Sequence, residues 1–472
     1  MNNKLRQALL LCVCVSGIGS GVSQNVSSYT EFSTNLHTGD HTPLWQVSKQ
    51  QGLSSLKNNA YLRGATTIHG NLRKWQYEAG ADLVVATGFT PKVVIQQLYG
   101  DFRYKSWGIY AGSKEIHSPL LNPELSSGGL TWSGNARPIP QIGGGLVDYL
   151  RLAPRVRMKA TASFGFFTDN NYQKHQVGED QWYTKSIKYS HRDLFFQFGI
   201  PQGKWTFDLG FTLDSQFGGY LISGNSKLDL GNKFINYVKA FIPMSGDEEV
   251  SSAERYFQGN FVGSEHLKLT YRNTDLLLSF YYENYFDDLS GARKQNGTDG
   301  LWSVEFQPYH CSFIKAIVLE YYQTTNQSGA LHGVSHPDVG KPNGNDNYYN
   351  NGLYPGWVHW GMGIGNPLVA SPIYNENGNM TFLYNRVKAF HLAWNGDISR
   401  EWRYTAKLTY NQTWGTHSKP LPAIRENFST FVEVGYTPEK LRTWDFRVSG
   451  ALDMGEIYGD NFGMQLKVKK TF

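Results

Sequence analysis

The final stretch of the chain alternates between apolar and polar positions. One face of this extended segment carries the mostly apolar side chains Phe462, Met464, Leu466, Val468, Lys470 and Phe472. Strand side chains point alternately to opposite faces, so the small and polar residues between them share the other face. The same alternation recurs at 156–166 and at 402–410, where Trp402 and Tyr410 stand at the two ends of the apolar face. Such strands are typical of a transmembrane β-barrel, whose outer wall contacts lipid.

Segments with this strand-like pattern recur along the whole chain. They lie near 26–37, 60–69, 75–87, 93–104, 107–114, 138–151, 155–168, 182–199, 203–217, 262–272, 274–286, 300–308, 313–325, 380–396, 400–413, 427–436, 441–454 and 461–472. An even number of strands is usual in single-chain bacterial barrels. The sequence therefore predicts an all-β fold, a transmembrane antiparallel β-barrel of about 18 strands.

The connections between these segments alternate in length. Those after even-numbered strands are short, at 70–74, 105–106, 152–154, 201–204, 273–274, 309–311, 397–400 and 437–440. The others include long ones, at 37–59, 115–137, 218–261, 287–300, 326–379 and 415–426. Short periplasmic turns and long outer loops are the usual asymmetry of these barrels. Both termini are therefore predicted to face the periplasm, and the long loops to be exposed at the cell surface.

One segment departs from the period of two. At 230–242 the apolar residues, which include Phe234, Val238 and Phe241, are spaced as on one face of a helix. A short helical insertion is predicted there. It either plugs the lumen or caps the outer rim, since periodicity does not say on which side of the wall a helix lies.

The amino-terminal stretch is organised like a secretory signal peptide. Lys4 and Arg6 precede an apolar run at 8–15, and small residues follow up to Ser23 and Gln24. Residues 1–24 are interpreted as a leader, and 25–472 as a single barrel domain. Beyond the leader, no apolar run of about 18 residues remains, which excludes membrane-spanning helices. Cys311 is the one cysteine left, so no intramolecular disulfide is predicted.

Composition and charge narrow the expected partners and cellular location of the protein. Aromatic residues make up 15% of the chain, as expected for a protein with aromatic girdles at two membrane interfaces. The formal net charge of +5 is mild, and the basic residues are dispersed, so nucleic acid is not an expected partner. With the export signal, these features predict a protein of the outer membrane of a Gram-negative bacterium, in contact with outer-membrane lipid. We expect a monomer.

The loop at 343–366 is rich in aromatic, asparagine and glycine residues. Its candidate polysaccharide-binding side chains are Tyr348, Tyr349, Tyr354, Trp357, His359 and Trp360. Sugars present flat C–H faces that stack on aromatic rings, and hydroxyls that hydrogen-bond to polar side chains. In the alternative interpretation these aromatics fold the loop back as a lumen plug or belong to the outer girdle.

A second polar loop lies at 122–141. It contains Trp132, Asn135 and Arg137 ahead of two prolines, which favour an ordered backbone. Arg137 could pair with an acidic sugar. Alternatively, these residues form an internal hydrogen-bond network.

Other polar groupings lack the spacing of a known reactive site. Asp40–His41 and Asp287–Asp288 lie near the predicted outer rim, where some barrel proteases place paired acids and an Asp–His couple. Because no companion motif accompanies them, we interpret them as salt links or solvated loop residues rather than as a reactive site. Asn345, Asp346 and Asn347 lack the EF-hand spacing. We predict no catalytic residues, no cofactor and no metal, and hence no enzyme.

Four long segments together resemble the capsule assembly Wzi family in its Bacteroides-group form. They are NPELSSGGLTWSGNARPIP at 122–140, NKFINYVKAF at 232–241, DDLSGARKQNGTDGLWSVEF at 287–306 and YYNNGLYPGWVHWGMGIGNPL at 348–368. The resemblance covers essentially the whole mature chain. It implies an occluded outer-membrane barrel that binds capsular polysaccharide as a lectin and helps to attach and organise the capsule. It also implies that a helical element such as 230–242 contributes to the occlusion. The terminal Phe472 resembles the signal by which the barrel assembly machinery recognises its substrates.

Three functions fit these observations. The first is a surface lectin without enzymatic activity, held to a repeating polymer by many weak contacts. The second is a passive outer-membrane porin, which the polar inward faces also permit. The third is a barrel hydrolase. Steady conductance in planar bilayers favours the porin, and silence favours the plugged lectin.

Overall fold

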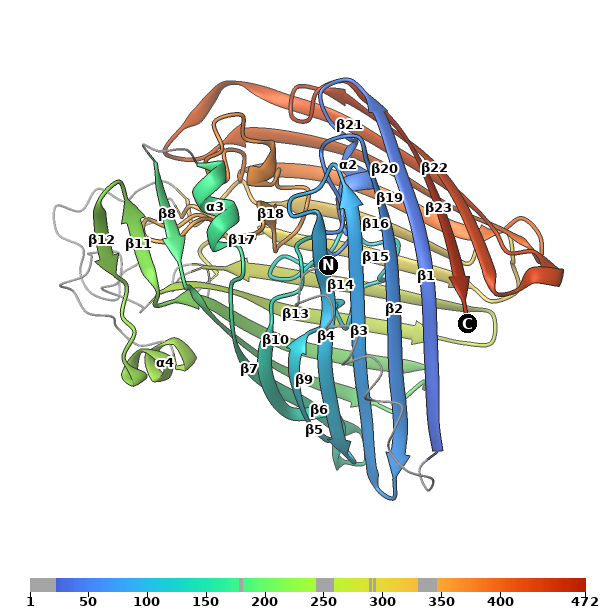
Figure 1. Cartoon of the computed structure of the whole chain (residues 1–472). Coiled ribbons are helices and arrows are strands. Elements are labelled where there is room, and N and C mark those ends of the chain that lie inside the picture. Colours follow the sequence, from blue (N-terminus) through green and yellow to red (C-terminus); the bar gives the residue numbers. More distant parts are fainter. Residues whose placement is uncertain (1–22, 178–180, 243–258, 288–290, 292–293, 330–345) are drawn as a thin grey trace, which may run out of the picture.

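The computed structural model describes residues 23–177, 181–242, 259–287, 291, 294–329 and 346–472. In these ranges eighteen strands form one antiparallel sheet that closes on itself (Figure 1). The closure joins β23 (Asn461–Thr471), the last strand, to β1 (Ser23–Thr38), the first. The predicted barrel of about 18 strands is confirmed. Cleavage of the leader at 1–24 stays a prediction, since most of it lies outside the described residues.

Most of the other barrel strands follow the predicted segments closely, but β21 (Pro420–Tyr436) starts seven residues before the predicted 427, so the long loop predicted at 415–426 is mostly strand. The other barrel strands are β2 (Asn59–Leu72), β3 (Trp75–Thr87), β4 (Val93–Tyr104), β5 (Trp107–Ser113), β6 (Gln141–Ala153), β7 (Val156–Phe166), β9 (Lys188–Gly199), β10 (Trp205–Phe217), β13 (Asn260–Arg272), β14 (Leu276–Phe286), β15 (Gly300–Pro308), β16 (Ala316–Gln323), β19 (Val387–Asp397), β20 (Trp402–Gly415), β21 (Pro420–Tyr436) and β22 (Trp444–Gly455). The predicted segments 75–87, 93–104 and 300–308 match β3, β4 and β15 at both ends.

One predicted strand is divided into two. The segment 182–199 contains β8 (Trp182–Lys185) and then β9, because Ser186 adopts a left-handed backbone conformation with φ of 60° and interrupts the extended run. Only β9 belongs to the barrel. β8 pairs instead with β11 (Tyr220–Ser223), which pairs with β12 (Ser226–Asp229), so these strands form a small sheet of their own at the left of Figure 1.

The wall keeps the alternation that the sequence shows. On β23 the side chains of Phe462 and Met464 are 47% and 53% exposed on the outer face, whereas Gln465 points inward and is only 8% exposed. Trp402 and Tyr410 are both exposed on the outer face of β20, as predicted. An apolar outer surface of this kind requires lipid around it. The protein therefore has the wall of an outer-membrane β-barrel.

The helices that lie wholly in the described ranges are short. They are α2 (Leu44–Val47), α3 (Asn170–Gln176), α4 (Phe234–Phe241), and the 3-10 turns η3 (Pro372–Tyr374) and η4 (Glu439–Leu441). Over the ranges that the structure describes, a helix of the length and apolarity needed to cross a membrane is not found.

The helix predicted at 230–242 is confirmed as α4, but it lies outside the lumen. The ring of Tyr237 packs 5.7 Å from that of Phe164, which is on the outward face of β7. The occluding role that the family resemblance implied for this segment is therefore wrong. The helix packs on the outward face of the wall, at the end that carries the long loops; that this end is the outer rim stays a prediction.

Long loops fill the lumen, as predicted. In the described ranges the loops that enter it are 39–58, 114–140 and 324–386 without 330–345, and together we call them the plug. Inward side chains of the wall hold them: Trp45 Nε1 donates to Thr409 Oγ1 (3.0 Å), and His391 Nε2 donates to the carbonyl of Leu125 (2.8 Å). Residues 380–386, predicted as strand, belong to the plug because β19 starts only at Val387.

Candidate functional site

Most of the aromatic residues that were candidates for sugar binding lie inside the plug. The fully buried ones are Tyr348, Tyr349, Tyr354, Trp357 and His359. Trp357 Nε1 donates to the carbonyl of Thr131 (2.9 Å), and the Tyr349 hydroxyl donates to the carbonyl of Leu130 (2.7 Å). These bonds join two loops that are far apart in the sequence. In this conformation the five side chains pack against protein, as the lumen-plug interpretation expects, and offer no face to a polysaccharide.

The candidates of the second loop also form internal contacts. The indole N–H of Trp132, which is half-buried, donates to the Asp214 carboxylate and to the Tyr189 hydroxyl (3.0 Å). Asn135 is buried, and its Nδ2 donates to the carbonyl of Gly363 (3.0 Å). An internal hydrogen-bond network, the alternative interpretation of this loop, is therefore present. Binding of polysaccharide by these residues stays a prediction.

Trp360 differs from the other aromatics because it is partly exposed and its backbone is strained. It stands with Gly361 at the tip of a hairpin between β17 (Val358–His359) and β18 (Met362–Gly363). Both tip residues have positive φ, 56° and 78°, the geometry of a hairpin turn that favours Asn-Gly. Tryptophan is a costly residue at such a position.

Arg137 lies beneath this ring. Its guanidinium carbon is 4.5 Å from the centroid of Trp360, within cation–π distance. The guanidinium donates to the carbonyls of Thr90 (2.9 Å) and Gly52 (3.3 Å), which hold it in place without cancelling its charge. Burial lowers the pKa of Arg137 to about 10, so the side chain is still cationic at neutral pH.

Residues at the start of α3 complete the surroundings of Trp360. Thr168 Oγ1 accepts from the indole N–H (3.1 Å), and Asp169 Oδ2 accepts from the backbone N–H of Trp360 (3.1 Å). The ring of Tyr172 lies 5.5 Å from that of Trp360, and its hydroxyl occupies the space where a side chain on Gly361 would begin. Three loops therefore converge on one tryptophan at the end of the barrel that carries the long loops.

His359 connects the same loops and is neutral. Its Nδ1 donates to the carbonyl of Arg137 (2.9 Å), while its Nε2 accepts from the backbone N–H of Thr168 (3.2 Å). A proton on Nε2 would face that N–H, so protonation breaks the contact. Burial accordingly lowers the pKa of His359 below its ordinary value of 6.5.

We expect the hairpin to loosen in mild acid. Because the pKa of His359 is lower in the folded than in the unfolded state, the unfolded state binds more protons, and stability falls as the pH drops through about 6.5. Hydrogen exchange of the amides at 358–363, corrected for intrinsic rates, should show weaker protection at pH 5 than at pH 7. His359→Gln should remove this difference. Equal protection of the wild-type hairpin at both pH values would contradict the assignment.

The Trp360 site combines a partly exposed ring with a buried cation. A partly exposed ring offers a stacking face to the C–H surface of a sugar, and Arg137 supplies a positive charge close to it. Sequence reasoning identified Trp360 and Arg137. It missed Thr168, Asp169 and Tyr172, which stand on a third loop whose only signal is a polar turn after a strand.

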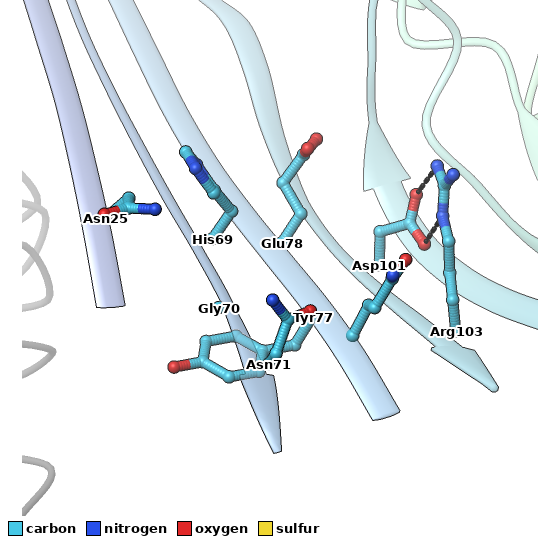
Figure 2. A pocket seen from close by; sticks show the side chains of 9 residues that line it. Asn25, His69, Gly70, Asn71, Tyr77, Glu78, Asp101 and Arg103 are labelled. Atoms are coloured by element: carbon cyan, nitrogen blue, oxygen red, sulfur yellow. Dashed lines mark hydrogen bonds and ion pairs between the residues drawn. The ribbon is translucent and has the colours of Figure 1, made fainter. Parts of the chain in front are cut away.

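The half of the lumen next to the short turns contains polar cavities. One cavity of about 400 Å³ lies at the ends of β2, β3 and β4 (Figure 2). Figure 2 shows Asp101 and Arg103 paired at its side (2.9 Å), with Glu78 nearby on the adjacent strand. Lys114 bridges the two acids, at 2.8 Å from Glu78 and 3.3 Å from Asp101.

A second cavity, of about 430 Å³, opens near the turns before β20 and after β21. Its basic lining residues are Lys49, Lys315, Arg403, Lys407, Arg447 and Lys467, and its acidic ones Glu124, Asp397 and Glu433. Burial lowers the pKa of Lys49 to about 7, and its ammonium donates to the carbonyls of Pro123 (3.1 Å) and Ser126 (2.5 Å). Lys49 therefore fastens one plug loop to another above this cavity.

No metal-binding grouping is found among the described residues. In those ranges no cluster of three or more histidine, cysteine or acidic side chains is arranged to hold a metal. His41 packs edge-on against Tyr374 at 5.6 Å. Asp288 and Asn345, two of the residues weighed for other chemistry, lie outside the described residues.

Comparisons with known proteins give no family. No family model matches the chain, and no curated protein does. Among solved structures it is similar to Pseudomonas aeruginosa OccK5 (OpdH), with 9% identity over 95% of this chain and 98% of that one and a TM-score of 0.48. It is also similar to Pseudomonas aeruginosa OprD, with 10% identity over 96% and 97% and a TM-score of 0.48. A loop-deletion mutant of OmpT, an outer membrane protein of Vibrio cholerae, covers 95% of this chain and 99% of its own with 8% identity and a TM-score of 0.38. Likenesses this weak carry no argument about function.

Proposed function

We propose that the protein is a non-enzymatic surface lectin that binds capsular polysaccharide and helps to attach and organise the capsule. One observation carries this proposal: Trp360 is held partly exposed, over Arg137, at the strained tip of an extracellular hairpin. Strained backbone at a surface is retained where the side chain is needed. Here an asparagine would relieve the strain but would lose the ring.

The chemistry of the site favours an acidic polymer. The indole suits the apolar face of a sugar ring, and the guanidinium of Arg137 beneath it, a residue that is only 8% exposed, adds a positive charge that favours an anionic sugar at a short distance. A single site of this size binds weakly. A polymer that repeats the same unit can engage many barrels in the membrane, so that avidity holds it at the surface.

The plug supports a role at the surface rather than in transport. Its loops are bonded to one another and to the wall, as at Trp357–Thr131 and His391–Leu125. A barrel whose lumen is filled in this way presents a fixed extracellular face. Such a face suits retention of a large polymer better than passage of small solutes.

The variant Trp360→Asn tests the site directly. Asparagine accepts positive φ and completes an Asn-Gly turn, so the plug should fold at least as stably as before. Loss of the ring should weaken binding roughly five-fold or more, the effect of a stacking contact of about 1 kcal/mol. Two measurements test this. One is a pull-down of capsule from the protein's own strain by purified protein, and the other is the amount of capsule that cells carrying the variant shed into the medium.

Trp360→Tyr is the matched control. It keeps an aromatic face and the same backbone cost, and should retain most of the binding. If Trp360→Asn retains capsule as well as the wild type, at equal protein levels, the site is wrong. If purified wild-type protein binds no capsule at all, the lectin function itself is wrong.

A passive porin is the second candidate, favoured by the charged cavities that open toward the periplasm. Planar-bilayer recordings separate the two functions, because steady open channels in the wild type would support the porin.

Two further predictions stay untested. They are insertion by the barrel assembly machinery through the terminal Phe472, which is 66% exposed, and a monomeric state.

A further inference from the structure

Helix α4 is docked on the outer wall of the barrel, where lipid is expected. The ring of Tyr237 lies 5.1 Å from Phe217 and 5.7 Å from Phe164, and the ring of Phe241 lies 5.7 Å from Phe164. Phe164 and Phe217 stand on outward faces at the extracellular ends of β7 and β10. Figure 1 shows α4 beside these strands, away from the lumen.

An arginine of the wall fixes the helix at its carboxyl end. Arg192 lies on the outward face of β9, and its guanidinium donates to the carbonyls of Ala240 (2.8 Å) and Phe241. The same guanidinium lies 5.4 Å from the ring of Phe241 and 5.7 Å from that of Phe261. A cation at the carboxyl end of a helix is favoured by the helix dipole. The helix is therefore held against the wall at a defined height.

The other face of α4 is apolar and uncovered by the described protein. Phe234 is 82% exposed, Ile235 is 51% exposed, and Ile242, which follows the helix, is 56% exposed. Side chains of this kind do not remain in water without cost. Because α4 lies on the lipid side of the wall and at its extracellular end, the surroundings of this face are the outer leaflet of the membrane.

The charge of the neighbouring surface is basic. Over 182–188 and 219–242, which include β8, β11, β12 and α4, the sequence has five lysines and one aspartate. Lys233, at the start of the helix, and Lys227, on β12, are both exposed. Lysines beside an inserted apolar face attract anionic lipid headgroups.

We propose that α4 is an interfacial helix that inserts Phe234, Ile235 and Ile242 into the outer leaflet, with lysines around it that bind the phosphates of anionic lipids. The helix then fixes the height of the barrel in the membrane and ties the extracellular rim to the lipid surface. This inference is independent of glycan binding.

Spin-label accessibility tests the insertion. Cys311, the free cysteine of the described chain, is replaced by serine, and a nitroxide is placed at Phe234→Cys or Ile235→Cys in full-length protein in nanodiscs of a phosphatidylglycerol. Leu319→Cys, on the lipid face of β16, gives the lipid standard, and Asn225→Cys, at the exposed β11–β12 turn, gives the water standard. The substituted side chains are exposed, so heat-modifiable migration on gels should show intact barrels.

Labels at 234 and 235 should resemble the one at 319, reached by oxygen and protected from a water-soluble nickel chelate. Accessibility to the chelate like that at 225 would overturn the proposal. Spin–spin broadening that disappears on dilution with unlabelled protein would also overturn it, because a second copy would then cover this face.

The lysines are tested separately by lipid preference. Native mass spectrometry should show retention of phosphatidylglycerol over phosphatidylcholine by the wild type. Lys227→Gln with Lys233→Gln should reduce that preference by roughly five-fold for each lysine. An unchanged preference in the double variant would overturn the phosphate-binding part of the proposal.

Discussion

Trp357→Ala is expected to open the lumen of an otherwise intact barrel. The indole is fully buried, lies 6.2 Å from the ring of Tyr189 and donates to the carbonyl of Thr131. Truncation of a buried tryptophan to alanine costs about 3–5 kcal/mol. That cost falls on the plug and not on the strand ladder. The plug should therefore open in a measurable fraction of molecules while the wall stays folded.

Planar-bilayer recording measures this effect. Wild-type protein should be silent, and Trp357→Ala should show channel openings. Trp75→Ala is the matched control, because Trp75 is 52% exposed on the outer wall near the periplasmic turn and does not contact the plug. Openings of equal size and frequency in the wild type would show that the described loops do not close the lumen.

Glu283→Gln combined with Glu320→Gln is expected to release the plug loop at 122–137. Both carboxylates point inward and are 1% exposed. Glu283 accepts from the backbone N–H of Leu130 (2.9 Å), and Glu320 accepts from that of Ser127 (2.8 Å). Glutamine keeps an acceptor oxygen but loses the charge. Because hydrogen bonds to charged groups contribute about 1.5–3 kcal/mol and neutral ones about 1 kcal/mol, the pair together should lose roughly 1–3 kcal/mol of local stability.

Hydrogen exchange of the amides at 122–137 measures the release of this loop. Heat-modifiable migration on gels shows whether the barrel wall remains folded. Glu426→Gln provides the control, since Glu426 lies exposed on β21 and its carboxylate bonds to Gln412 and Tyr410 of the neighbouring strand β20. Protection of the loop at the wild-type level in the double variant would mean that the loop is held without these carboxylates.

The glutamine double variant and Trp357→Ala probe different contacts of the plug. Trp357 belongs to the contact between two plug loops, whereas Glu283 and Glu320 belong to the contact between plug and wall. If only Trp357→Ala opens the lumen, the loops close it by packing on each other. If the glutamine pair also opens it, attachment to the wall is equally required.

Sequence reasoning went furthest where the governing interactions are local. Strand boundaries such as 75–87 and 300–308 were predictable to the residue because alternation and turn length are both read within a dozen positions. It was weaker where an irregular backbone intervenes, as at Ser186, whose left-handed conformation divides a continuous strand-like pattern.

The candidate site was predictable only in part. Aromatic composition identified the loop at 343–366, but most of its rings serve the plug, and composition does not separate buried from exposed rings. Trp360 meets Arg137 and Tyr172 from loops that are about two hundred residues away in the chain. Such contacts leave no local pattern.

The sequence by itself determined the barrel, its number of strands and the end of it that carries the long loops, because a lipid-facing wall forces every strand to alternate. Only the tertiary structure decided that α4 lies on the outer wall, that the tyrosines of one loop are buried in the lumen, and that one tryptophan remains at the surface above an arginine. Periodicity tells which side chains share a face. Which neighbour covers that face depends on contacts between distant segments, and these form only when the barrel closes.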